Sequence, residues 1–178
     1  GATDTANVAV TVAPINDTPL LSADSASTNE DAPVNIAVLG NDSDPDGDTL
    51  AITAVNGVAI NVGSPVSVSG GSISLLPDGS LEFTPDADFN GPTTFNYTAD
   101  DGNGGSAVGS VSVAVNPLND APIATNDAAS TNEESPVGID VIANDTDIDG
   151  DTLNATHVNG TPISVGETVT VANGSVTL

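Results

Sequence analysis

Residues 110–115 read Ser-Val-Ser-Val-Ala-Val and place a valine at every second position. Residues 7–12, Asn-Val-Ala-Val-Thr-Val, carry the same alternation. A period of two puts the valines on one face of a β-strand and the smaller or polar residues on the other. Phe95 and Tyr97 alternate in the same way, and no segment shows sustained helical periodicity. The sequence therefore predicts half-buried strands throughout.

Turn-forming dipeptides separate the alternating runs. Each one places glycine after Asp, Asn or Gly, as at Asp46-Gly47, Asn56-Gly57, Gly70-Gly71, Asp78-Gly79, Asn90-Gly91 and Asp101-Gly102. Such dipeptides are typical of tight turns between strands. About seven to nine short strands within roughly 100 residues favour a Greek-key β-sandwich of immunoglobulin type. The predicted fold class is all-β.

The chain repeats itself at a fixed distance. The decapeptide Asn41–Leu50, Asn-Asp-Ser-Asp-Pro-Asp-Gly-Asp-Thr-Leu, returns 103 residues later as Asn144–Leu153 with two substitutions. Ser27–Val34 and Ser130–Val137 match at the same offset. A constant period indicates a tandem array of one structural unit. We expect three parts: the last strand of a preceding repeat in residues 1–16, a complete repeat in residues 17–119, and the incomplete N-terminal part of the next in residues 120–178.

The composition excludes several functions. The chain carries 25 Asp and Glu residues, no Lys and no Arg, which gives a formal net charge of −25. Without cationic side chains it cannot neutralise phosphate, so we expect neither a nucleic-acid partner nor direct membrane insertion. No apolar run approaches the ~20 residues of a membrane span. There is no cysteine, so no disulfide braces the fold.

Each copy of the decapeptide contains four carboxylates at alternate positions. They are Asp42, Asp44, Asp46 and Asp48 in the first copy, and Asp145, Asp147, Asp149 and Asp151 in the second. Anions this close repel one another unless a cation or hydrogen-bond donors compensate them. Ca²⁺ favours flexible sites made only of oxygen ligands, so we predict Ca²⁺ as the cofactor. A solvated turn is the competing interpretation.

An EF-hand is excluded for these loops. That loop requires a bidentate Glu at its twelfth position, where this chain has Thr53 in the first copy and Thr156 in the second. A strand-like sequence follows each loop, where an EF-hand would continue as a helix.

Several motifs in a constant order carry a family resemblance. Asn-Glu-x-x-Pro-Val precedes the acidic decapeptide, which is followed by Tyr97–Gly105 and then by Asn119-Asp120-Ala121-Pro122. This order resembles the cadherin-like, immunoglobulin-like repeats of giant secreted bacterial adhesins of the RTX type, and it covers the whole chain. The resemblance implies tandem cadherin-like β-sandwiches that act as extender modules of a long stalk.

The resemblance also implies where the chain works and with what. It places the protein outside the cell, on a bacterial surface or in a secreted matrix, with Ca²⁺ stiffening the junctions between modules. The partners are then the neighbouring repeats of the same chain, and self-assembly into fibres is left open. The ligand of an adhesive tip would bind outside this segment.

The resemblance finally implies the Ca²⁺ ligands, which neighbouring modules and their linker share. For the first junction they are Asn16, Asp17, Asp42, Asp44, Asp46 and Asp100. For the second they are Glu30, Asp86, Asp88, Asn119, Asp120, Asp145, Asp147 and Asp149. Repetition adds Glu133, the counterpart of Glu30.

Other functions have less support. His157 aligns with Ala54 of the preceding repeat, so we expect it to be a surface strand residue without a catalytic role. We expect Tyr97 to be buried, with its hydroxyl bonded to a loop carbonyl. Paired carboxylates hydrolyse glycosides in some enzymes, but here they lie in repeated turns and we expect no enzymatic activity. A Ca²⁺-dependent glycan-binding module and an accessory spacer of a secreted enzyme stay open as alternatives.

Overall fold

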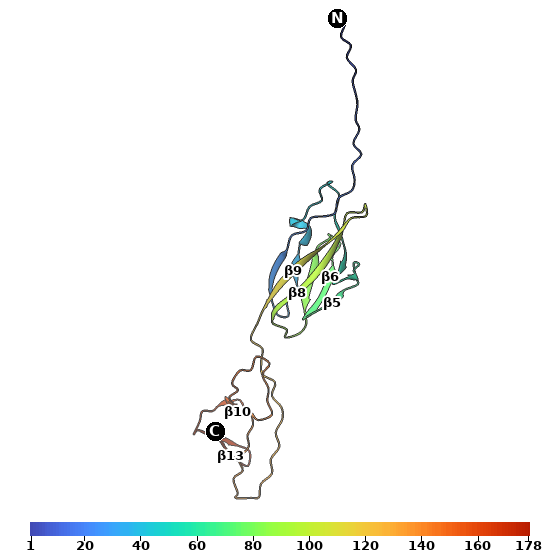
Figure 1. Cartoon of the computed structure of the whole chain (residues 1–178). Helices are drawn as coiled ribbons and strands as arrows, with labels where there is room; N and C mark the ends of the chain where they lie inside the picture. The colour runs from blue at the N-terminus through green and yellow to red at the C-terminus, as the bar shows by residue number, and fades with distance from the viewer. The chain divides into compact units, whose positions relative to one another are not determined.

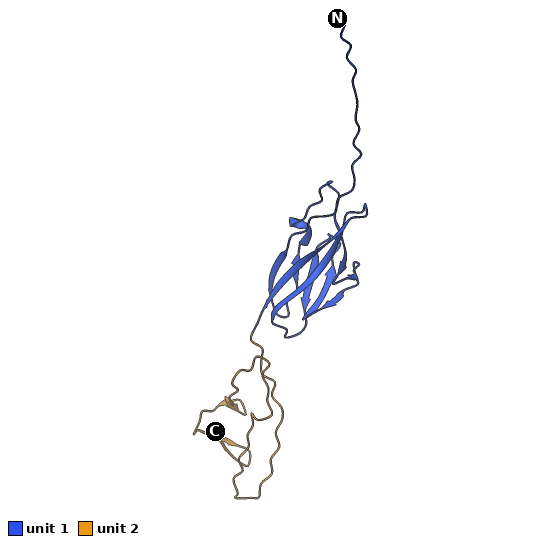
Figure 2. Cartoon of the chain, viewed as in Figure 1, with its two compact units in different colours: residues 1–118 blue, residues 119–178 orange.

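The computed structural model describes all residues from 1 to 178 and divides them into two compact units. Unit 1 comprises residues 1–118 and unit 2 residues 119–178 (Figure 2). The regular structure is almost entirely β, since the one helical segment is a four-residue 3-10 turn, η1 (Val38–Asn41). None of the helical structure has the length and apolar character needed to cross a membrane.

Unit 1 is a two-layer sandwich of nine strands (Figure 1). The strands are β1 (Asp24–Asn29), β2 (Val34–Ile36), β3 (Ala51–Val55), β4 (Val58–Ala59), β5 (Val66–Val68), β6 (Gly71–Leu75), β7 (Leu81–Pro85), β8 (Gly91–Asp100) and β9 (Ser106–Asn116). One sheet has the order β1-β9-β8-β3-β4 and the other β2-β7-β6-β5. Two packed, mostly antiparallel sheets of this size form an immunoglobulin-like fold, which confirms the predicted fold class.

The long hairpin of β8 and β9 forms the centre of the larger sheet. Its register runs without a break from the pair Gly91 and Val115 to the pair Asp100 and Ser106. The inward valines of β9 are almost fully buried, with Val113 at 0% exposure. The alternation predicted from the sequence is therefore confirmed here. Each buried valine contributes about 1.5–3 kcal/mol relative to an exposed one.

The core joins the inward faces of both sheets. It is mainly aliphatic, with Phe83, Phe95 and Tyr97 as its buried aromatic side chains. The other members are Ile36, Val38, Ile52, Val55, Ile60, Val66, Ile73, Leu81, Ala99, Val111, Val113 and Val115. The core contains Tyr97 of β8 together with Val38 of η1, which precedes β3. The end of β8 is therefore held against the loops that precede β3.

The first strand of the module is divided between the two sheets. β1 pairs in parallel with β9, and β2 pairs antiparallel with β7. Between them the chain turns at Asp31, whose φ of 59° lies in the left-handed region. The Thr28 hydroxyl donates a hydrogen bond to the Ala32 carbonyl across this turn (2.8 Å).

Residues 1–15 of unit 1 form no strand. Val8, Val10 and Val12 are exposed by 86%, 80% and 85%, although they match the buried valines of β9 at an offset of 103 residues. Their assignment to the last strand of a preceding repeat stays a prediction.

Unit 2 consists of two separate hairpins joined by loops. One pairs β10 (His157–Val158) with β11 (Thr161–Pro162), and the other pairs β12 (Thr168–Val171) with β13 (Gly174–Thr177). At the repeat offset these hairpins match β3–β4 and β5–β6, with the same cross-strand partners. Ile163, at 5% exposure, is the one buried hydrophobic residue of this unit.

Candidate metal centre

The acidic loop, residues 42–48, connects η1 to β3 in unit 1. The segment that enters the module is paired with this loop. The Leu20 N–H donates to the Ser43 carbonyl (2.8 Å), and the Ser43 N–H donates to the Leu20 carbonyl (3.1 Å). The segment 16–22 therefore lies along the loop, and the predicted ligands Asn16 and Asp17 come close to it.

Three carboxylates of the loop gather at one place. Oxygen atoms of Asp44, Asp46 and Asp48 all lie within 4.8 Å of one another. The Asp44 Oδ1 accepts the backbone N–H groups of Asp46 (2.8 Å) and Asp48 (3.4 Å), which is an Asx turn. The Asp44 Oδ2 is buried and has no hydrogen-bond partner. A buried, uncompensated carboxylate oxygen is costly, and a hard cation such as Ca²⁺ would compensate it, so these residues fit the ion.

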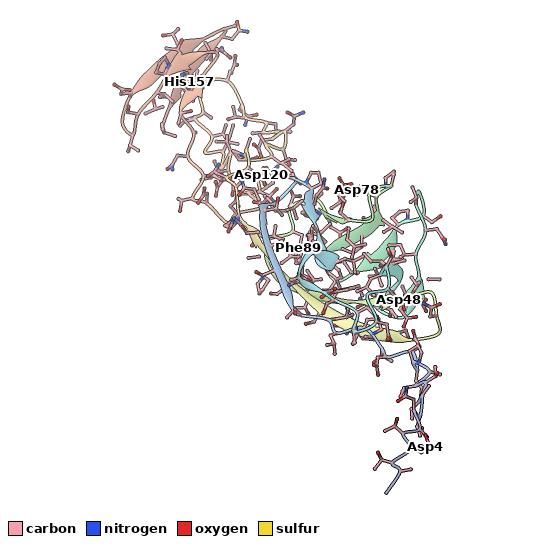
Figure 3. All side chains as sticks on the ribbon, turned by 90° about the horizontal axis from the view of Figure 1, so that it is seen from above. Asp4, Asp48, Asp78, Phe89, Asp120 and His157 are labelled. Atoms are coloured by element: carbon pink, nitrogen blue, oxygen red, sulfur yellow. The ribbon has the colours of Figure 1, made fainter.

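The entering segment contacts the same group of carboxylates. The Asp17 N–H donates to the Asp46 Oδ2 (2.7 Å). The Asn103 side-chain amide, from the loop between β8 and β9, donates to the Asp48 Oδ2 (2.8 Å). Figure 3 shows Asp48 at the end of unit 1 from which the N-terminal segment leaves, with Asp78 well away from it. Two separate segments, the entering segment and the loop between β8 and β9, thus converge on the acidic loop.

Asp42 has a different environment from the rest of the acidic loop. Its Oδ1 accepts the Ser22 N–H (2.8 Å), and its Oδ2 accepts the Tyr97 hydroxyl (2.6 Å). Both oxygens are therefore engaged by the protein, and the side chain braces the loop against the core. A role for Asp42 as a metal ligand stays a prediction.

Tyr97 is buried as predicted, but the predicted carbonyl partner of its hydroxyl was wrong. β8 places the ring next to the acidic loop, so the hydroxyl donates its hydrogen bond to the carboxylate of Asp42 and not to a backbone carbonyl. Burial raises the pKa of the Tyr97 phenol, and the negative charge of Asp42 raises it further. The phenol therefore stays protonated and serves as a hydrogen-bond donor.

Asp24 belongs to the same environment. Burial raises the pKa of its carboxyl, and repulsion from Asp42 acts in the same direction. Its Oδ2 is buried and unpartnered. This carboxylate was not predicted from the sequence, although its counterpart Asp127 lies at the repeat offset.

Asp101 is another carboxylate near the acidic loop that was not predicted from the sequence. It is 4% exposed, whereas the predicted ligand Asp100 is more exposed and accepts the Gly102 N–H (2.8 Å). The Asp101 Oδ2 accepts the side-chain amide of Asn16 (2.8 Å). That amide is the largest of the hydrogen-bonding causes that hold the pKa of Asp101 below its ordinary value. Asp101 continues the inward phase of Tyr97 along β8, and this period of two could have identified it.

Gly105 allows the entering segment to approach Asp101. A Cβ atom at this position would lie 2.1 Å from the Asp101 Oδ2 and 3.0 Å from the Asp17 carbonyl oxygen. No side chain fits into that space without displacing the entering segment. Glycine at 105 therefore serves the contact between the entering segment and the loop.

A second set of predicted ligands lies around the turn that follows β1. Glu30 is 1% exposed, and its carboxylate accepts the Leu118 N–H and the Asn90 side-chain amide (3.4 Å). The Asp88 N–H donates to the Oδ1 of Asp31, which was not predicted (3.4 Å). Glu30 thus attaches the segment that leaves β9 to the first strand of the module.

The remaining predicted ligands of this end are less enclosed. Asp86 and Asp88 are both exposed. The Asp86 N–H donates to the Gly70 carbonyl (2.9 Å), which fixes the backbone but not the carboxylate. Their roles as ligands stay predictions.

Unit 2 reproduces the hydrogen bonds of the acidic loop of unit 1. The Asp120 N–H donates to the Asp149 Oδ2 (2.7 Å), as Asp17 does to Asp46. The Thr125 N–H donates to the Asp145 Oδ1 (2.8 Å). The predicted ligands of this second loop therefore have the same local arrangement as those of the first.

The centre of the second acidic loop and its flanks follow the same pattern. The Asp147 Oδ1 accepts the N–H groups of Asp149 and Asp151, both at 3.1 Å. The Asn119 side-chain amide donates to the Asp120 carbonyl (2.7 Å).

Glu133, unlike Glu30, is exposed.

Two structural expectations are confirmed, namely the surface position of His157 and the strand that follows the first acidic loop. His157 is exposed in β10, with its Nδ1 3.1 Å from the Thr156 hydroxyl (Figure 3). β3 follows the acidic loop directly, so no EF-hand helix is present at this position.

The architecture and its repetition define the class of this protein as a tandem immunoglobulin-like repeat protein. Its sequence matches the bacterial Ig domain family over residues 16–114 and again over residues 119–178. The chain belongs to the bacterial Ig domain family. No curated protein matches it.

Solved structures show similarities at low sequence identity. One is a nucleoside hydrolase-related hypothetical protein from Saccharophagus degradans, described as associated with carbohydrate metabolism (18% identity, TM-score 0.40). The matched part covers 58% of this chain and 26% of that one. Another is the tandem Ig repeats of Dlar (16% identity, TM-score 0.30), with 61% of this chain and 54% of that one covered.

Proposed function

We propose that these repeats are Ca²⁺-stiffened spacer modules of a long extracellular bacterial adhesin or surface fibre. Membership of the bacterial Ig domain family and the repetition of one unit support a structural, non-enzymatic role. The observation that carries the proposal is the group formed by Asp44, Asp46 and Asp48. Their oxygens lie within 4.8 Å of one another, in a chain that has no Lys or Arg to compensate them.

The contacts of the entering segment explain how an ion would stiffen the fibre. Asp17 donates its N–H to Asp46, and Asn16 donates its side-chain amide to Asp101. Without a cation, repulsion among the loop carboxylates opposes this arrangement. A Ca²⁺ ion held by the loop carboxylates removes that repulsion, so the entering segment stays attached to the module that follows it.

The proposed extracellular location suits a weak affinity of the acidic loop for Ca²⁺. Extracellular Ca²⁺-binding modules have dissociation constants of about 10⁻⁴–10⁻³ M. An exposed loop of carboxylates, with only part of its oxygens enclosed, suits this weak range better than that of an intracellular sensor. The modules would therefore be loaded outside the cell.

Thermal unfolding with and without Ca²⁺ tests the binding site. At a hundredfold excess over its dissociation constant, Ca²⁺ should stabilise the chain by about 2.7 kcal/mol. Asp44→Asn with Asp46→Asn should abolish most of this gain. Asp78→Asn is the matched control, because Asp78 lies in the turn after β6 and accepts bonds only from Ser80. Equal losses from both variants would show that general charge relief governs stability.

Small-angle X-ray scattering tests the spacer role itself. In Ca²⁺ the chain should give the profile of a narrow, extended ensemble, and in EGTA that of a broader, more bent one. If Ca²⁺ binds but the two scattering profiles are indistinguishable, the binding site is supported and its mechanical role is refuted.

A further inference from the structure

One peptide bond of the first acidic loop differs chemically from every other bond of the chain. It joins Asp44 to Pro45, and it is the one place among the 178 residues where proline follows aspartate. At the repeat offset the second loop has Ile148 after Asp147. The bond before a proline is a tertiary amide without a hydrogen on its nitrogen. Such a nitrogen accepts a proton more readily than that of an ordinary peptide bond, so it is the better leaving group.

The turn around this bond polarises the carbonyl group of Asp44. Residues 44–47 form a β-turn in which the Gly47 N–H donates to the Asp44 carbonyl oxygen (3.1 Å). Pro45 stands at the second position of the turn, which proline favours because its ring fixes φ. A donor on a carbonyl oxygen stabilises the negative charge that forms there when a nucleophile adds to the carbon. The carbonyl carbon of Asp44 is therefore activated for attack.

The side chain of Asp44 supplies the nucleophile. Its Oδ1 accepts the N–H groups of Asp46 and Asp48, whereas its Oδ2 is buried and has no hydrogen-bond partner. Carboxylates act as nucleophiles in covalent catalysis. Attack within a single residue also avoids the entropy cost of bringing two molecules together. Attack by Oδ2 on the carbonyl carbon of the same residue closes a five-membered ring.

We propose that Asp44-Pro45 is a self-cleavage site and that Ca²⁺ protects it by binding the Asp44 Oδ2. In the reaction this oxygen attacks the Asp44 carbonyl carbon, the bond from that carbon to the Pro45 nitrogen breaks, and the nitrogen takes up a proton from solvent. Water then opens the cyclic anhydride and leaves two carboxyl groups on Asp44. The net change is the addition of one water molecule, with no oxidation or reduction. The protection rests on the proposed function, whereas the cleavage itself does not.

The cut module would stay assembled, because paired strands lie on both sides of the cut. β1 and β2 precede Pro45, and they pair with β9 and β7, which follow it. The fragments 1–44 and 45–178 are therefore held together by the fold and separate only in denaturant. Loss of Ca²⁺ would in this way leave a permanent covalent mark on the module.

Mass spectrometry of the full chain, dissolved in denaturant after incubation, tests the proposal. The protein is kept at one fixed, mildly acidic pH, either in EGTA or in Ca²⁺ at a hundredfold excess over the dissociation constant that calorimetry gives at that pH. In EGTA we expect the fragments 1–44 and 45–178 to accumulate together. At the stated excess about 1% of the sites are free of the ion, so cleavage in Ca²⁺ should be about 100-fold slower.

Two controls separate this reaction from general hydrolysis. Pro45→Ile gives the first loop the residue that the second loop has, so it should abolish cleavage in EGTA and leave Ca²⁺ binding unchanged. The bond from Asp147 to Ile148 is the control within the same chain. The Gly150 N–H donates to the Asp147 carbonyl (3.3 Å), so a similar turn surrounds this bond, but no proline follows. This bond should stay intact.

The outcomes distinguish the cleavage from its protection. The self-cleavage site is refuted if no fragments form in EGTA, or if Pro45→Ile is cut as fast as the natural chain. The protection is refuted if calorimetry shows Ca²⁺ binding while the cleavage rates in Ca²⁺ and EGTA are equal. If Ca²⁺ does not bind and the bond is cut in both buffers, the cleavage site stands and the proposed function fails.

Discussion

Removal of one hydroxyl, by Tyr97→Phe, tests how the acidic loop is attached to the core. The ring is fully buried, and its hydroxyl donates to the Asp42 Oδ2 at 2.6 Å. Phenylalanine fills the same space, so no cavity forms and only the hydrogen bond is lost. A hydrogen bond to a charged group contributes about 1.5–3 kcal/mol, and the Oδ2 of the half-buried Asp42 would be left without its donor. We expect a loss of about 2 kcal/mol in the free energy of unfolding.

The assay is urea and thermal unfolding of the full chain in EGTA, followed by far-ultraviolet circular dichroism. For a domain of this size, 1 kcal/mol corresponds to about 4–8 °C, so the midpoint should fall by about 8–16 °C. A double-mutant cycle with Asp42→Asn isolates the pair, because the two changes should not add. A loss below about 0.5 kcal/mol for Tyr97→Phe, or strict additivity in the cycle, would refute the brace that we assign to Asp42.

Further predictions concern the same end of unit 1. A Cβ atom at Gly109 would lie 2.3 Å from the Tyr97 Cζ. In urea unfolding, Gly109→Ala should therefore lower the free energy of unfolding by about 1–3 kcal/mol. Gly40→Ala is the control and should be nearly neutral, because a Cβ atom at Gly40 has nothing within 4 Å. The pKa of Asp101 is lowered in the fold, chiefly by Asn16, so its stabilising contribution is present above its ordinary pKa of 3.8 and is lost as the pH falls through the folded-state value. The stability advantage of the natural chain over Asp101→Asn, measured in EGTA, should therefore shrink from about pH 5 to about pH 2, and a constant advantage would contradict this assignment.

Much of the fold could be predicted because strands of a β-sandwich alternate apolar, buried residues with polar, exposed ones. Phe95 and Tyr97 alternate with polar residues, and both are buried. The same period extends to Asp101, but an acidic residue at an inward position was interpreted as part of a turn, and Asp100 was chosen instead. A burial pattern alone does not show that a carboxylate finds enough donors to stay inside, as Asp101 does through Asn16 and its own loop.

The partners of buried polar groups were the least predictable feature. Repetition identified the acidic loops, and the grouping of Asp44 with Asp46 follows from their spacing in one turn. The bond between Tyr97 and Asp42 joins residues 55 positions apart, and the carboxylate of Glu30 accepts the N–H of Leu118, which is 88 positions away. Such contacts arise from the packing of two sheets, which no local pattern specifies.

The parallel pairing of the first and last strands has a mechanical consequence. β1 and β9 lie side by side over six residue pairs, from Asp24 opposite Val111 to Asn29 opposite Asn116. Because they run in the same direction, the chain enters at one end of this ladder and leaves at the other. Tension applied through the chain ends therefore acts along the strands and shears all the cross-strand bonds together. An antiparallel pair of end strands would peel apart one bond at a time, so this topology lets the module carry load while it stays folded.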